Sequence, residues 1–176
     1  MMKKLIFPLI LFLLLVSEGV ALDLLPNILT STETLIVPHW IFVFLILIAL
    51  FYDTSDTFYA VIFGVFFGIF VDIAYTEVLG VYMFVYPLAI YIVQLLKRML
   101  QTNFYMTMII TVISISIVEM LIYFIYSFVG IVDATMSYFV LHRLLPTILA
   151  NVLFLIPLYF LSVNTLMRWS REQLEK

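Results

Sequence analysis

The sequence predicts an all-α membrane protein, a polytopic helix bundle with about six transmembrane helices. Hydrophobic residues make up 66% of the chain and charged residues only 11%, whereas soluble domains carry roughly 25% charged residues. The mean hydropathy is +1.25. A chain of 176 residues has room for about six crossings at roughly 20 residues each. We therefore expect a single integral membrane domain, residues 1–176.

The first expected span covers residues 5–22 and follows Lys3 and Lys4. It ends near Gly19-Val-Ala21, a small-x-small pattern that also resembles the cleavage site of a signal peptide. Cleavage is therefore an alternative to a retained span. Residues 23–38 form a polar, turn-rich connection that also contains several leucines, and a short interfacial helix is expected there.

Five further apolar stretches complete the predicted bundle, each bounded by charged or turn-forming residues. The second is short for a membrane crossing unless it is tilted. Prolines interrupt the fourth and bend the sixth, because proline removes a backbone donor from a helix. These expected spans are residues 39–52, 58–75, 81–96, 104–129 and 144–166.

The distribution of lysine and arginine predicts the orientation. If the N-terminus is cytoplasmic and there are six spans, seven of the eight basic residues lie inside, as the positive-inside rule requires. Only Arg143 then lies outside. We expect a multi-pass membrane protein with both termini in the cytoplasm.

The third span carries the pattern around which the rest of the chain is organised. Gly64, Gly68 and Asp72 follow one another at steps of four, and Gly80 comes eight residues later. Steps of four place the first three on one side of a helix. A Gly-x-x-x-Gly pair lets helix backbones approach closely, and an intramembrane carboxylate needs a partner or a wet cavity. This face should pack on a neighbouring helix or on a partner protein, and the sequence leaves both open.

Six charged residues gather towards the outer ends of the predicted spans: Glu18, Asp23, Asp72, Glu77, Asp133 and Arg143. Glu18, Asp72, Glu77 and Arg143 are the residues expected to form a polar pocket there. A lone arginine among carboxylates at low dielectric is a natural ion-pair partner. We predict an outer polar pocket in which Arg143 pairs with Asp72 or Glu77. The alternative is an interfacial arginine solvated by lipid headgroups.

Glu119 is the most deeply placed charge of the chain. Ser116, Glu119 and Tyr123 are spaced three and four residues apart, so they share one helix face. Hydroxyl groups are therefore expected beside the carboxylate, on the side that faces the bundle. Two roles remain open, a protonated glutamic acid hydrogen-bonded between helices and a proton relay.

Enzyme and metal motifs are absent from the sequence. There is no cysteine, and His39 and His142 lack metal-ligand spacing. Neither a Gly-x-Ser-x-Gly pattern, a phosphate-binding loop nor a dinucleotide fingerprint occurs. Basic residues are too few and scattered for nucleic acid. We expect no catalytic residue, cofactor, metal or nucleic acid, and paired intramembrane carboxylates are the remaining enzymatic alternative.

The stretch Gly64-x-x-x-Gly68-x-x-x-Asp72, followed by Gly80 and an aromatic-aliphatic span, resembles the MreD family of rod shape-determining proteins. The length, the Lys-Lys start, the number of spans and the short charged tail are similar as well. By motif the resemblance covers residues 60–95, and by architecture it covers most of the chain.

The resemblance implies a non-enzymatic component of the bacterial cell (plasma) membrane that belongs to the cell-wall elongation machinery. Such a protein would bind MreC and help organise peptidoglycan synthesis to maintain rod shape. Further partners implied, directly or indirectly, are MreB, RodA and a class B penicillin-binding transpeptidase. The implied helix arrangement is similar to that of the substrate-binding membrane subunits of energy-coupling-factor vitamin transporters.

Two other functions compete with this interpretation. A transporter-type subunit would capture a small, vitamin-type substrate in the outer pocket and would need an ATP-hydrolysing partner. A proton-coupled carrier would use Glu119 and Asp72 and would show pH-dependent flux in vesicles.

Overall fold

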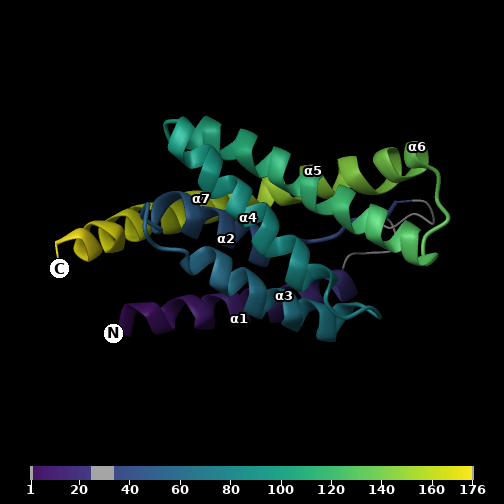
Figure 1. The fold of residues 1–176 in the computed structure, drawn as a ribbon, viewed down its shortest axis with the longest axis horizontal. Helices are drawn as coiled ribbons and strands as arrows, with labels where there is room; N and C mark the ends of the chain where they lie inside the picture. Colours follow the sequence, from purple (N-terminus) through teal and green to yellow (C-terminus); the bar gives the residue numbers. More distant parts are fainter. Residues whose placement is uncertain (1, 25–33, 176) are drawn as a thin grey trace.

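The computed structural model describes residues 2–24 and 34–175. This part of the chain is helical without strands, so the predicted all-α membrane bundle is confirmed (Figure 1). Two single helices and one continuous helix over 136–174 are long and apolar enough to cross a membrane. Three shorter apolar helical stretches are Ile6–Ala21, Trp40–Phe51 and Tyr59–Tyr75. The elements are α1 (Met2–Leu24), α2 (Trp40–Phe51), α3 (Tyr59–Tyr75), α4 (Val81–Met99), α5 (Phe104–Val129), α6 (Met136–Phe139), η1 (Val140–Leu144) and α7 (Leu145–Leu174).

Helix α2 is the centre of the bundle. It contacts α1, α3, α4, α5 and α7, and every residue from Ile41 to Phe51 is buried. A helix that is apolar on all sides belongs in such an interior position. Its 12 residues rise only about 18 Å, which is less than the roughly 30 Å of a hydrocarbon core.

A non-helical segment, residues 34–39, leads into α2 and lies beside the start of α7. Pro146 has no N–H, so the carbonyl of His142 lacks its usual helical donor. That carbonyl accepts a hydrogen bond from the N–H of Leu35 instead, at 2.8 Å. Irregular backbone at membrane depth is tolerated where protein buries it. The expected interfacial helix is absent from residues 34–38, and residues 25–33 lie outside the described part.

Helices α3 and α4 form the most extensive helix-helix contact of the described chain. A Cβ atom on Gly68 would lie 2.6 Å from the carbonyl oxygen of Tyr82 and 2.7 Å from the Cα of Met83. One on Gly64 would lie 3.3 Å from the backbone of Pro87. The glycine face therefore packs on α4 within the same chain.

Both termini lie at the same end of the bundle (Figure 1). Near the carboxyl end of α2, Asp53 accepts hydrogen bonds from the N–H groups of Tyr59 and Ala60 and so holds the start of α3. Lys97 donates to the carbonyls of Ala49 and Asp53, which satisfies acceptors that a helix end leaves open. At the opposite end, α6, η1 and α7 continue as one helix.

Candidate functional site

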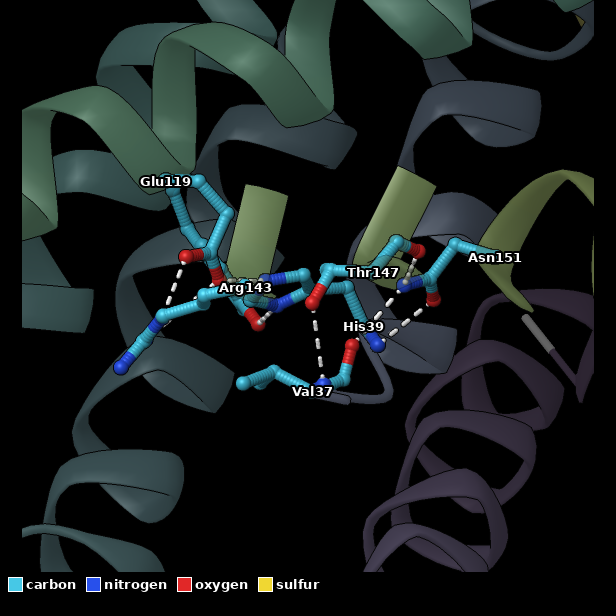
Figure 2. A network of polar contacts seen from close by, with 7 residues as sticks. Val37, His39, Glu119, Arg143, Thr147 and Asn151 are labelled. Atoms are coloured by element: carbon cyan, nitrogen blue, oxygen red, sulfur yellow. Dashed lines mark hydrogen bonds and ion pairs between the residues drawn. The ribbon is translucent and has the colours of Figure 1, made fainter. Parts of the chain in front are cut away.

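A buried polar network joins the start of α2 to α4, α5 and η1 (Figure 2). His39 is fully buried. Its Nδ1 atom is 2.9 Å from the hydroxyl of Tyr86, and its Nε2 atom is 2.8 Å from Oε1 of Glu119. Arg143 donates from Nε to the other carboxylate oxygen of Glu119 at 2.7 Å. Both carboxylate oxygens of the buried Glu119 are therefore bound.

The prediction that Arg143 pairs with Asp72 or Glu77 is wrong, because its partner is Glu119. Helix α5 and the helix that begins at Met136 are joined by a short connection, which brings the arginine beside the carboxylate on α5. The side chain of Glu119 is fully buried and that of Arg143 is 23% exposed. An ion pair of this kind avoids an isolated charge in a low-dielectric interior.

The expected hydroxyl neighbours of Glu119 bind elsewhere. Ser116 donates to the carbonyl of Val112, one turn earlier in its own helix, as serine commonly does within helices. Tyr123 donates to the carbonyl of Ala134. A shared helix face therefore did not predict hydrogen bonds to Glu119, because each hydroxyl donates to a backbone carbonyl instead.

Side chains of α7 form hydrogen bonds with the backbone of the non-helical segment, residues 34–39. Asn151 accepts a hydrogen bond from the N–H of His39 at 2.7 Å and donates to the carbonyl of Val37 at 2.9 Å. Thr147 accepts from the N–H of Val37 at 3.1 Å. The sequence analysis missed these residues. Their signal was the presence of two polar side chains, one turn apart, after Pro146 in an otherwise apolar helix.

Replacing Asn151 with leucine should loosen residues 37–39, because a buried N–H and a partly buried carbonyl would lose their partner. We expect a loss of about 2 kcal/mol in unfolding free energy and hydrogen exchange about tenfold faster at the amides of Val37 and His39. Hydrogen-exchange mass spectrometry in detergent measures this. Asn164→Leu, an exposed change on the same helix, should leave the exchange unchanged. Equal exchange in both variants would contradict the assignment.

Glu18 binds the N-terminus of α2. Its Oε1 atom accepts from the N–H of Ile41 at 2.8 Å, and the residue is 2% exposed. A carboxylate is favourable there, because the first N–H groups of a helix lack partners and carry partial positive charge. Helix α1 also buries Phe7, Leu11 and Leu15 in the core, so it is an integral part of the bundle.

Asp72, at the end of α3, binds the N-terminus of α4. Its carboxylate accepts from the N–H groups of Gly80, Tyr82 and Met83 at 2.9–3.0 Å. Gly80 has φ +99°, a conformation that side chains oppose. The connection can therefore turn back directly onto the carboxylate, which is fully buried.

Asp72→Ala should lower the unfolding free energy by about 3 kcal/mol, since three backbone N–H groups lose their acceptor and each buried unsatisfied donor costs roughly 1–3 kcal/mol. Denaturant titration of the purified protein in mild detergent measures the loss. Glu77→Ala, an exposed carboxylate five residues later, serves as the control and should stay within about 0.5 kcal/mol of wild type. Similar stability of both variants would contradict the capping role.

A cavity of about 310 Å³ lies beside this network. Glu18, Glu77 and Arg143 line it, so three of the four residues predicted for an outer polar pocket do meet there. Asp72 is not among the lining residues. Within residues 2–24 and 34–175, acidic residues and histidines form no group of three that is suited to a metal ion.

The family model of the rod shape-determining protein MreD matches residues 3–169. The chain belongs to the MreD family. It is also 28% identical over 173 residues to the rod shape-determining protein MreD of Bacillus subtilis (strain 168), which covers 95% of this chain and 99% of that protein. No solved structure matches, so the likeness to energy-coupling-factor subunits stays a prediction. MreD membership confirms the family resemblance and gives the chain a role in cell shape.

The residues that carried the MreD resemblance have one structural task in this chain. Gly64 and Gly68 bring α3 against α4, and Asp72 closes the pair by binding the start of α4. Gly80 permits the turn between the two helices. The motif therefore encodes a helical hairpin.

Proposed function

We propose that this protein is a non-catalytic membrane component of the cell-wall elongation machinery, which binds MreC and helps organise peptidoglycan synthesis to maintain rod shape. The observation that carries the proposal is the use of the buried acidic groups. Glu119 is bound by Arg143 and His39, and Asp72 and Glu18 are bound to helix N-termini. Groups bound in this way stabilise one helix arrangement, as a scaffold requires.

The proposed topology has six crossings and two cytoplasmic termini. An even number of crossings agrees with the position of both termini at one end (Figure 1). Lys97 and Arg98 lie in the last turn of α4 and Arg171 in that of α7, while Arg143 lies near the start of α7. The positive-inside rule makes the end with more basic residues cytoplasmic.

The proposed contact with MreC uses the outer surface of the bundle. Because α4 already occupies the face of Gly64 and Gly68, a partner helix has to pack elsewhere. Helix association in lipid depends on close packing and interhelical hydrogen bonds, so a fixed bundle offers a defined surface. MreB, RodA and a class B penicillin-binding transpeptidase would be reached through MreC or directly.

A mild-detergent pull-down of the tagged protein from its own host tests the proposal, with mass spectrometry of the recovered proteins. We expect MreC and wall-synthesis proteins. Asp72→Ala should reduce MreC recovery only in proportion to the loss of folded protein, because Asp72 is bound within the chain. Recovery of an ATP-hydrolysing module in place of MreC would contradict the proposal and favour a transporter subunit.

A further inference from the structure

The 310 Å³ cavity contains two polar groups that the fold leaves unused. Tyr82 lines the cavity and is only 6% exposed, yet its hydroxyl forms no hydrogen bond within the described part of the chain. Arg143 uses Nε and Nη2 on Glu119, and Nη1 has no partner among the described residues. Neither atom is sealed off by protein, so both can donate a hydrogen bond to a ligand in the cavity. We infer that this cavity binds a small organic carboxylate.

Two donors in one cavity suit an anionic oxygen. A guanidinium group carries five N–H donors, so Arg143 can donate to a second acceptor through the N–H groups that do not bind Glu119. A phenol hydroxyl can donate beside it. Hydrogen bonds from arginine to a carboxylate are among the strong ones in proteins. Glu119 neutralises the charge of Arg143. The site therefore binds a carboxylate through hydrogen-bond donors and not through an unpaired positive charge.

The walls of the cavity suit an apolar or aromatic body. Its lining includes the rings of Tyr75, Tyr82, Tyr86 and Tyr126 together with Pro38. Aromatic walls with a few placed polar groups are typical of small-molecule sites, and their volumes run from roughly 300 to 1,000 Å³. This cavity lies at the lower limit, which indicates a ligand about as large as a small aromatic acid.

The remaining charges limit the ligand to a single negative charge. Glu18 also lines the cavity, but it is bound to the start of α2. Glu77 is exposed, lines the same cavity and has no ion-pair partner in the described part of the chain. A doubly charged phosphate ester would be repelled by Glu77 more strongly than a monocarboxylate. This inference does not depend on MreC binding.

Ligand binding to the purified full chain in detergent tests the inference, with phenylacetate as the probe. Calorimetry and thermal shift should detect phenylacetate at about 10 mM, well above a millimolar Kd. The neutral phenylacetamide and the cationic phenethylamine should bind at least about tenfold more weakly. Failure of phenylacetate to bind, or equal binding of the amide, would overturn the inference.

Two variants locate the binding and give effects of opposite sign. Tyr82→Phe removes a hydroxyl without a partner in the described chain, so the fold should persist while phenylacetate binds about tenfold more weakly. Tyr91→Phe, an exposed change on the same helix, is the matched control. Glu77→Gln should strengthen phenylacetate binding about threefold, because it removes like charge. Unchanged binding in Tyr82→Phe, or weaker binding in Glu77→Gln, would contradict the site.

Discussion

Gly68→Ala should separate α3 from α4 and destabilise the protein by about 3 kcal/mol. The added Cβ would lie 2.6 Å from the carbonyl oxygen of Tyr82 and 2.7–2.8 Å from backbone atoms of Met83. Backbone cannot yield by rotating a side chain, and overpacking costs typically 1–3 kcal/mol and occasionally more. The helix-propensity gain of alanine over glycine, about 1 kcal/mol, offsets only part of this. Denaturant titration in detergent measures the change.

Gly64→Ala is the matched control on the same helix face. Its Cβ would lie 3.3 Å from backbone atoms of Pro87, a tight but far less severe contact. We expect its unfolding free energy to stay within about 1 kcal/mol of wild type, because higher helix propensity compensates for a small displacement. If both variants behaved alike, the close approach at Gly68 would not determine the hairpin.

Arg143→Met should destabilise the protein by about 4 kcal/mol. The change leaves the fully buried carboxylate of Glu119 with His39 as its remaining side-chain partner. Removing one member of a buried ion pair typically costs 3–5 kcal/mol, since an uncompensated charge stays behind. Arg171→Met, an exposed change near the end of α7, is the control and should have little effect. The unfolding midpoint in denaturant reports both.

The double variant Arg143→Met with Glu119→Met completes the test. Replacing both charges by apolar side chains of similar volume is often neutral or stabilising. Glu119→Met also removes the partner of Nε2 of the buried His39, so part of the lost stability should return. The coupling energy from the double-mutant cycle should be at least about 2 kcal/mol. A double variant as unstable as the sum of its single variants would show that the two side chains act independently.

The helices were predictable because their signal is compositional. Long apolar runs must satisfy their own backbone in lipid, and helices do so. The start of α2 was harder to predict, because residues 34–38 are nearly as apolar as the helix that follows and yet are not helical. Their conformation depends on Thr147 and Asn151, more than 100 residues away in sequence. The periodicity of apolar residues in one sequence carries no information about contacts between such distant residues.

The site was predicted in part. Spacing placed Gly64, Gly68 and Asp72 on one face, and the positions of span ends brought Glu18, Glu77 and Arg143 to one cavity. The predicted ion pair of Arg143 with Asp72 or Glu77 was wrong. The positions of charges at one end of a bundle do not show which of them bind other groups of the protein. Asp72 binds backbone N–H groups at the start of α4, and a count of charged side chains does not include such groups.

The most direct test of the account is the shape of cells that depend on the double variant Arg143→Met with Glu119→Met. Microscopy of a rod-shaped host lacking its own MreD protein compares wild type, each single variant and the double variant at matched protein levels. If the buried pair serves the fold of a scaffold, the single variants should give rounded cells and the double variant should restore rods. Rounded cells with a stably folded double variant would contradict the account and show that the pair performs chemistry, such as proton transfer.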